Sequence, residues 1–234
     1  MNLVIFDVDG TLTNTNSVDD ACFVKAFADA HAITGISSDW AAYPHTTDSG
    51  ITLDIFRERF GRAPEAVELA QLTRCFIGLL SEQYQSNSAH FAEIPGAADA
   101  LNLLQQESAW AIAIATGSWR ESALLKLKAA GVKIDGIPVA VAEDGVSREE
   151  IIQAAVSKAK AYYRQSEFEK IVSVGDAIWD VHAAARSHIA FLGVGSGESE
   201  AKMRQAGARH IVKDFADFAQ LMRCLNEAEV PQVE

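Results

Sequence analysis

Two aspartates near the start of the chain are the first residues whose type and spacing point to chemistry. Asp7 and Asp9 follow Leu3–Phe6, a short apolar run that predicts a strand buried on both faces. Carboxylates two residues apart on a strand share a face, and they repel unless a cation or a proton lies between them. Because open α/β sheets bind ligands at the carboxyl ends of their strands, the pair predicts an acidic site there. An acidic turn built with Gly10 and Thr11 is the alternative interpretation.

Two later apolar runs also end in polar residues. The run WAIAIA precedes Thr116 and Gly117, and a hydroxyl beside a free backbone N–H at a strand-to-helix turn is suited to phosphoryl oxygens. The run Ile171–Val174 precedes Asp176 and, one helical turn farther, Asp180. A hard cation such as Mg²⁺ prefers oxygen ligands of this kind. An aspartate that only caps the following helix is the alternative for Asp176.

These segments resemble the signatures of the haloacid dehalogenase (HAD) superfamily, which consists mostly of phosphate-ester hydrolases with an aspartate nucleophile. DVDGTLT, Asp7–Thr13, resembles the first signature, and Thr116 with Gly117 matches the position of the second. Gly175–Asp180, GDAIWD, matches the fourth. The third matches loosely, because Glu143–Glu150 has neither the lysine nor the prolines that the family often carries there. The resemblance spans nearly the whole chain.

The resemblance implies a role for each matched acid. Asp7 would be the nucleophile that forms an aspartyl-phosphate, and Asp9 would act as general acid and then general base. Mg²⁺ would be the cofactor, held by Asp7, the Asp9 carbonyl and Asp176. Asp180 would support the ion directly or through water.

The resemblance also implies contacts to the phosphoryl group. Thr116 and Gly117 would hold its oxygens. Arg148 is the candidate for the positive charge of the third signature, because it begins the helix on the approach to the fourth strand and a guanidinium would balance charge there. Surface pairing of Arg148 with its neighbouring glutamates is the alternative, and Lys158, farther along the helix, is the second candidate.

The chain after the first strand predicts a helical insertion. Val18–His31 carries apolar residues at the three-and-four spacing of an amphipathic helix, and similar stretches follow at Gly50–Phe60 and Pro64–Ser86. Ser17 is the expected N-cap of the first. We therefore expect residues 17–90 to form an all-helical cap, and residues 1–16 with 91–234 to form the catalytic core.

A polar loop, Tyr43–Gly50, separates the first two of these helices and contains both proline and glycine. It is either a connecting turn in which Asp48 or Ser49 caps the next helix, or a segment that faces the active site. In the second case His45 and Thr46 would help to select the substrate. The residue pattern leaves both interpretations open.

From residue 94 onward, apolar strands and single helices alternate. The predicted strands are Trp110–Ala115, Ile137–Ala142, Ile171–Val174, Ile189–Val194 and His210–Val212. The predicted helices are Ala97–Glu107, Arg120–Ala130, Arg148–Tyr163 and Phe215–Asn226. Ser147 is expected to cap the third helix, with Glu150 at capping-box spacing. This alternation predicts an α/β fold, a doubly wound parallel-sheet, Rossmann-like core, with the cap as an insertion.

Composition narrows the classes of partner. A net charge of −12 argues against nucleic acid or an anionic membrane surface. The three cysteines are scattered and predict neither disulfides nor a zinc site, and no signal peptide is expected, so a cytoplasmic location is favoured. Lys126 and Lys128 are interpreted as solvated charges of a helix.

The expected function is a Mg²⁺-dependent phosphatase that acts on a small phosphorylated metabolite, such as phosphoglycolate or a sugar phosphate. The resemblance is to phosphoglycolate phosphatase and β-phosphoglucomutase relatives. A phosphomutase is the main alternative, because the same residues would return the phosphoryl group to a sugar. A phosphoacceptor signalling module is a further alternative, although receiver domains are shorter and lack a helical insertion. Whether the protein is a monomer or a homodimer is left open.

Overall fold

The structure is a computed structural model that describes residues 1–232. Its centre is a parallel sheet with strand order β3-β2-β1-β4-β5-β6. The strands are β1 (Asn2–Phe6), β2 (Trp110–Ala115), β3 (Val139–Ala140), β4 (Ile171–Gly175), β5 (Ala190–Val194) and β6 (His210–Val212). The predicted doubly wound parallel sheet is confirmed. Because β1 pairs with β2 on one side and β4 on the other, the ends of these three strands lie side by side.

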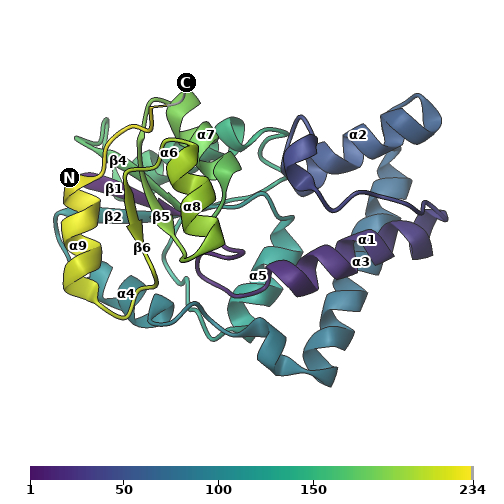
Figure 1. Cartoon of the computed structure of the whole chain (residues 1–234), viewed down its shortest axis with the longest axis horizontal. Helices are drawn as coiled ribbons and strands as arrows, with labels where there is room; N and C mark the ends of the chain where they lie inside the picture. The colour runs from purple at the N-terminus through teal and green to yellow at the C-terminus, as the bar shows by residue number, and fades with distance from the viewer. Residues whose placement is uncertain (233–234) are drawn as a thin grey trace.

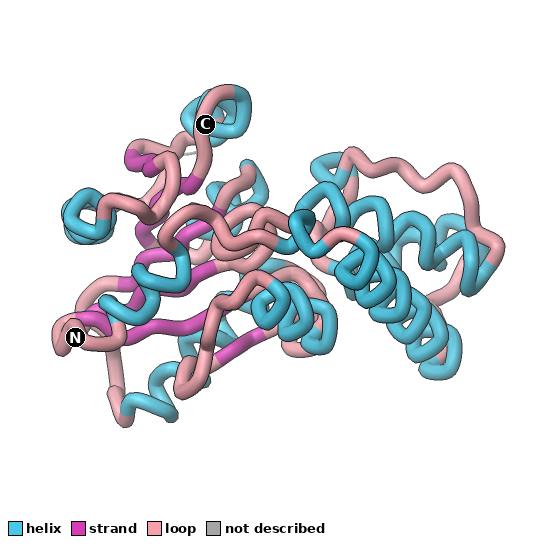
Figure 2. The backbone as a smooth tube through the Cα atoms, turned by 90° about the horizontal axis from the view of Figure 1, so that it is seen from below, coloured by secondary structure: helices cyan, strands magenta, loops and turns pink. Residues whose placement is uncertain are grey.

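Helices cover both faces of the sheet, as Figures 1 and 2 show. Val4 and Phe6 of β1 pack in a cluster with α4 (Ala97–Leu104) and α9 (Phe218–Glu227). Leu3 and Ile5 pack on the opposite face with α6 (Arg148–Tyr163). This alternation is the two-residue period of a strand, and it explains why the whole run is apolar. The remaining core helices are α5 (Arg120–Ala129), α7 (Ile178–Arg186) and α8 (Glu198–Gln205).

The helices of the predicted insertion lie together at one side of the sheet, on the right in Figure 1. They are α1 (Asn16–His31), α2 (Asp48–Phe60) and α3 (Ala66–Ser86), with short 3₁₀ turns η1 (Trp40–Ala42) and η2 (Ser88–Phe91). Their shared cluster includes Phe23 and Phe76, and the indole of Trp119 packs against both rings at centroid distances of 5.8 and 6.1 Å. Trp119 directly precedes α5, so an aromatic contact joins the helical part to the sheet-containing part.

Two predicted helix starts are wrong. α1 begins at Asn16, so Thr15 and not Ser17 occupies its N-cap position. The Thr15 hydroxyl donates to Asp9 and does not cap the helix, which is a tertiary contact that local sequence does not reveal. At α2 the cap is Thr47, whose hydroxyl accepts from the Gly50 N–H at 3.0 Å, and neither Asp48 nor Ser49 serves.

Three other predicted elements are shorter than expected. The helix predicted over Ala97–Glu107 is α4, which ends at Leu104. β3 pairs with β2 only over Val139 and Ala140, although Ile137–Ala142 is apolar. Beyond the paired residues, the Ala142 N–H donates to the Ser118 carbonyl in the turn after β2. The last helix starts at Phe218 and not at Phe215. Phe215 packs edge-on against Phe6 in the core, and Asp217 then caps the helix.

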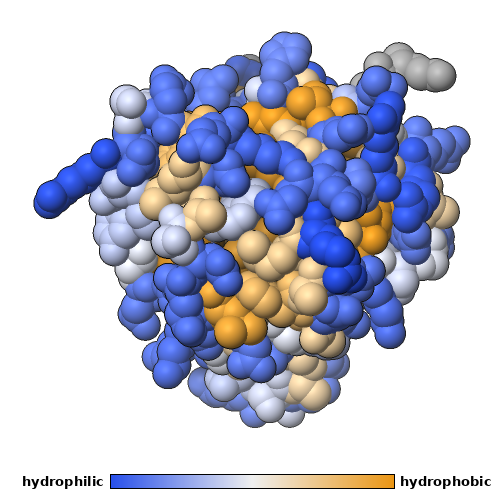
Figure 3. Space-filling model, turned by 90° about the vertical axis from the view of Figure 1, so that its left-hand side faces the viewer, coloured by the Kyte–Doolittle hydropathy of each residue, from blue (hydrophilic) through white to orange (hydrophobic). Residues whose placement is uncertain are grey.

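The surface mixes polar and apolar groups. Figure 3 shows the face that lies at the left of Figure 1, where hydrophilic side chains surround smaller apolar areas. Exposed large apolar residues such as Phe60, Leu103 and Tyr162 lie far apart in the sequence, as is ordinary for a globular protein. Over residues 1–232, none of the helices combines the length and the apolar character that crossing a membrane requires.

Candidate active site

Carboxylates meet where β1 and β4 end. Asp7 follows β1, Asp176 follows β4, and Asp180 lies in the first turn of α7. One carboxylate oxygen from each residue lies within 4.8 Å of one oxygen from each of the others. The parallel pairing of β1 with β4 is the reason that residues so far apart in sequence meet. Oxygen ligands at this spacing fit a divalent cation such as Mg²⁺.

The backbone after β1 approaches Asp176 closely. Gly10 has a φ of +73°, and a Cβ built at this position would overlap the Asp176 carboxylate. Only glycine combines this left-handed conformation with such a close approach. The Asn16 side-chain amide donates to Asp176 Oδ2 at 3.0 Å and orients that carboxylate. The close approach of Gly10 and the hydrogen bond from Asn16 position the Asp176 carboxylate near Asp7, where both could bind one cation.

Arg148 lies among these acids. Its Nη1 donates to Asp180 Oδ1 at 2.8 Å and to Asp7 Oδ1 at 3.3 Å, while its Nε donates to the Thr46 carbonyl at 3.2 Å. Lys158, the second candidate for this charge, instead donates to the Val139 carbonyl and to Asp144. Of these two candidates, only Arg148 contacts Asp7.

The N-terminus of α6 fixes the position of Arg148. Ser147 Oγ accepts from the Glu150 N–H at 3.2 Å, and Glu150 accepts in return from the Ser147 N–H at 3.1 Å. This reciprocal capping box, which the sequence predicted, makes Arg148 the first residue of the helix. The guanidinium also lies over the Trp179 ring, with 5.9 Å between its Cζ and the ring centroid.

The acids around Arg148 ionise less readily than usual. The pKa of Asp7 is raised to about 7, and burial is the largest cause. The Arg148 guanidinium opposes this shift in part, whereas the charges of Asp180 and Asp9 add to it. Burial, with the Asp180 and Asp7 charges, also raises the pKa of Asp176 well above its usual value. A bound cation would reverse both effects, because it stabilises the carboxylate forms.

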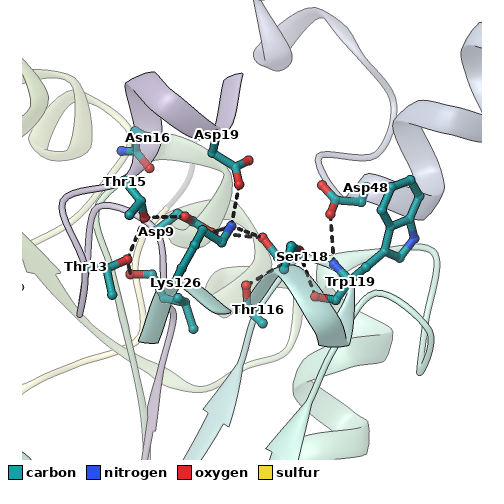
Figure 4. A network of polar contacts seen from close by, with 12 residues as sticks. Asp9, Thr13, Thr15, Asn16, Asp19, Asp48, Thr116, Ser118, Trp119 and Lys126 are labelled. Carbon is teal, nitrogen blue, oxygen red and sulfur yellow. Dashed lines mark hydrogen bonds and ion pairs between the residues drawn. The ribbon is translucent and has the colours of Figure 1, made fainter. Parts of the chain in front are cut away.

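The Asp9 side chain belongs to a second network, shown in Figure 4. Asp9 Oδ1 accepts from the Thr15 hydroxyl at 2.5 Å. Asp9 Oδ2 accepts from the Ser118 hydroxyl at 2.9 Å and from Lys126 Nζ at 2.6 Å. The same Nζ donates to Asp19 Oδ1 at 2.5 Å, so Lys126 links the turn after β1 to helix α1.

Lys126 corrects a prediction. Its side chain is 0% exposed, and it is an ion-pair partner and not a solvated charge, whereas Lys128 is exposed as expected. A signal was present in the sequence: Lys126 lies on the stripe of α5 that also carries buried Ser122, Ala123 and Leu127. A lysine on such a stripe needs buried acids as partners.

The charges of this network are interdependent. Burial opposes ionisation of Asp9, but the Lys126 charge and the hydrogen bonds from Lys126, Thr15 and Ser118 outweigh burial and lower its pKa. Burial likewise disfavours the Lys126 ammonium, yet Asp19 and Asp9 outweigh it and raise the pKa of that lysine. Burial is the largest cause at Asp19, and its pKa is raised to about 7 despite the nearby ammonium.

The turn after β2 lies between these two networks. Thr116 is buried, and its Oγ1 accepts from the Ser118 N–H at 3.1 Å, which leaves the hydroxyl proton for another acceptor. The Gly117 carbonyl accepts from the Asp48 N–H at 2.8 Å. Ser118, which the sequence did not single out, joins this turn to Asp9.

A pocket of about 570 Å³, including its opening to solvent, is lined by residues of both parts of the chain. The sheet-containing part contributes Asp7, Asp9, Thr116, Gly117, Arg148 and Asp176. The helical part contributes Asp19, Asp20, Phe23, Trp40, Thr46 and Asp48. Of the two loop residues expected near the substrate, Thr46 lies in this lining. His45 and Asp180 lie outside it, although Asp180 contacts Arg148.

Known proteins share this architecture. A model of the haloacid dehalogenase-like hydrolase family matches residues 1–188. A hydrolase from Pseudomonas syringae has a similar structure, with a TM-score of 0.72 and 23% identity over 97% of this chain and 99% of that one. A protein from Bacteroides vulgatus, provisionally named a β-phosphoglucomutase, has a TM-score of 0.68 and 17% identity over 97% and 89% of the two chains.

A third structure, of a predicted phosphoglycolate phosphatase from Haemophilus somnus, has a TM-score of 0.61 and 20% identity, covering 94% of this chain and 97% of that one. None of the curated protein sequences matches this chain. At these identities, the likeness to solved structures shows the fold and does not by itself transfer a substrate.

Proposed function

The chain belongs to the haloacid dehalogenase-like hydrolase family, and on this premise we propose that it is a Mg²⁺-dependent phosphatase that hydrolyses a small phosphate monoester. The observation that carries the proposal is the position of Arg148, whose guanidinium bridges Asp7 and Asp180 beside the Asp176 carboxylate. A nucleophilic carboxylate, a guanidinium and a set of cation ligands at one strand end are the groups that phosphoryl transfer requires.

In the proposed reaction, Asp7 attacks phosphorus and forms an aspartyl-phosphate as the bond to the leaving oxygen breaks. The Lys126 contact keeps Asp9 ionised, so Asp9 must first leave this partner and take up a proton from solvent, which it then gives to the leaving oxygen. Asp9 then takes a proton from a water molecule that attacks phosphorus and releases Asp7. Because both Asp9 oxygens are hydrogen-bonded within the protein, this role requires Asp9 to exchange partners when substrate binds.

Asp7, the Asp9 carbonyl and Asp176 would hold Mg²⁺, with Asp180 supporting the site through its contact with Arg148. When bound, the ion supplies positive charge that offsets the phosphoryl group. Thr116 and Gly117 would donate to phosphoryl oxygens, and Arg148 would balance the remaining charge. Residues 17–90 would form a cap over the pocket, in which Thr46 contacts substrate, and closure would exclude water. A cytoplasmic location remains part of the proposal.

The test is phosphate release from p-nitrophenyl phosphate and a panel of metabolite monoesters, in Mg²⁺ or EDTA. We expect Mg²⁺-dependent release that Asp7→Asn reduces by at least about a thousandfold, because the amide is not a nucleophile at neutral pH. Asp29→Asn, the same change on the exposed surface of α1, is the matched control and should retain full activity. Release that survives in Asp7→Asn would rule out this nucleophile.

A phosphomutase remains the alternative that uses the same residues. It would transfer the phosphoryl group between sugar hydroxyls only when a sugar bisphosphate primer is added. Phosphate release without a primer favours the phosphatase. Isomerised sugar phosphate with little free phosphate would favour the mutase.

A further inference from the structure

The wall of the pocket away from the phosphoryl end is acidic and aromatic. Asp19 and Asp20 project from α1, and Asp48 begins α2. Phe23 and Trp40, with ring centroids 5.9 Å apart, line the same wall. These residues all come from the helical part, whereas the proposed phosphoryl contacts come from the strand ends. The leaving group of a bound substrate would therefore face this wall.

Each of the three wall acids keeps one oxygen for a ligand. Asp20 Oδ1 accepts from the Trp40 indole at 2.7 Å, Asp48 Oδ2 from the Trp119 N–H at 2.8 Å, and Asp19 Oδ1 from Lys126. Within the described residues, no protein donor reaches the second oxygen of any of them. Asp48 is only 8% exposed, and in Figure 4 its carboxylate and that of Asp19 point toward the same open region.

Within residues 1–232, no basic side chain at this wall is free to bind a ligand. Among the described residues that line the pocket, the one basic side chain is Arg148, which is bound to Asp7 and Asp180 at the phosphoryl end. Lys126 is fully buried, and its three N–H donors are used by Asp9, Asp19 and Ser118. Among the described residues, the Asp20 carboxylate has no cationic partner, because only the neutral Trp40 indole donates to it. An anionic group on the leaving part of a substrate would meet this uncompensated charge.

We propose that the substrate is a phosphate monoester whose leaving group carries hydroxyl or ammonium donors and no negative charge. Such donors would satisfy the free oxygens of Asp19, Asp20 and Asp48, while the aromatic rings would cover C–H surface or a cation. The inference rests on the proposed phosphatase function. It disfavours phosphoglycolate and bisphosphates as substrates and favours neutral polyol or sugar monophosphates.

A matched pair of compounds tests this inference. Glycerol 3-phosphate and 3-phosphoglycerate differ by a hydroxymethyl group in place of a carboxylate. We expect kcat/KM for glycerol 3-phosphate to be higher by at least about tenfold, since one repelled charge changes affinity by that order. If both compounds turn over slowly, their inhibition of p-nitrophenyl phosphate hydrolysis measures binding instead. Glycerol 3-phosphate should then have the lower inhibition constant.

Two results would overturn the inference in distinguishable ways. Equal or better use of 3-phosphoglycerate, with p-nitrophenyl phosphate hydrolysed, would contradict the assignment of the leaving group and leave the phosphatase proposal intact. No Mg²⁺-dependent hydrolysis of any monoester would refute the phosphatase proposal and this inference with it.

Asp20→Asn locates the effect at the wall. The amide oxygen still accepts from the Trp40 indole, so the substitution removes a charge and keeps the hydrogen bond. We expect the preference for glycerol 3-phosphate to fall by about threefold to tenfold, mainly through a lower KM for 3-phosphoglycerate. Asp29→Asn, on the exposed face of the same helix, should leave the preference unchanged. An unchanged preference in Asp20→Asn, or an equal change in Asp29→Asn, would contradict the role of the wall.

Discussion

The Lys126 side chain is fully buried, and a buried ammonium is unfavourable unless acids pair with it. Lys126 satisfies its three donors on Asp9, Asp19 and Ser118, and its charge offsets two buried carboxylates. Burying a charged pair is itself unfavourable, so such a cluster is weak support for stability. Removing one partner is far more costly, because the remaining charges lose their compensation. The lysine therefore holds Asp9 and Asp19 together more than it stabilises the fold.

Replacement of this lysine provides a test at the residue scale. Lys126→Met keeps the length of the side chain and removes the charge, and we expect it to lower the free energy of unfolding by about 3–5 kcal/mol. Lys128→Met, two residues along the same helix and exposed, should change it by less than about 0.5 kcal/mol. Urea denaturation measures both values.

A double variant checks the physical reason. Adding Asp19→Asn to Lys126→Met removes one of the two carboxylates that the first substitution leaves unpaired. Part of the lost stability should then return, because fewer buried charges lack a partner. Equal effects of Lys126→Met and Lys128→Met would contradict the burial of this ion pair.

At the scale of the element, the first turn of α6 connects local sequence to the site. The capping box between Ser147 and Glu150 sets where the helix begins, and this start places the Arg148 guanidinium against Asp7. A shift of the helix start would move the guanidinium relative to the nucleophile. Helix capping is therefore coupled to the arrangement of charged groups in the pocket.

Ser147→Ala tests this coupling. Loss of the side-chain acceptor should reduce the free energy of unfolding by about 1 kcal/mol, and fraying of the first turn should lower kcat/KM for phosphate release. Ser157→Ala is the control: Ser157 lies in the middle of the same helix and donates only to the Gln153 carbonyl. Its replacement should not reduce either quantity, since alanine favours helix. If Ser147→Ala changed neither the free energy of unfolding nor kcat/KM, the capping argument would be contradicted.

At the scale of the whole molecule, the site gathers more buried acids than its basic residues neutralise. Burial raises the pKa of Asp7 and of Asp19 to about 7, and it raises that of Asp48 well above the usual value. An aspartate with a raised pKa binds its proton more tightly in the folded state than in the unfolded state. Between about pH 4 and about pH 7, the folded chain keeps protons that the unfolded chain releases.

Stability in the absence of metal should therefore decrease as pH rises across this window. Groups whose pKa is lowered on folding, such as Asp9, act in the opposite direction but below the window. Mg²⁺ binds the deprotonated carboxylates, so it should stabilise the protein more at pH 7.5 than at pH 5. Urea denaturation at both pH values, with Mg²⁺ or with Na⁺ at matched ionic strength, measures this difference. A stabilisation by Mg²⁺ that is the same at both values would contradict the shared acidic site.

The sequence by itself determined the features that depend on near neighbours. The apolar run before Asp7, the alternation of strands and helices as far as β4 and the capping box at Ser147 follow from local periodicity and short-range hydrogen bonds, so they were predictable. The helices α7 and α8 were not predicted. The parallel sheet followed from that alternation. The start of α1 could not be predicted locally, because the Thr15 hydroxyl donates to Asp9 and does not cap the helix.

Only the tertiary structure decided which buried polar groups meet. Lys126 lies 117 residues from Asp9 and 107 residues from Asp19 along the chain, so no local pattern connects them. Arg148 was a candidate by its place in the sequence, but its choice over Lys158 depends on the sheet order and on how α6 packs against β2. Periodicity reports which face of an element is buried. The contacts between faces are set by the docking of distant elements, where buried charges must find partners.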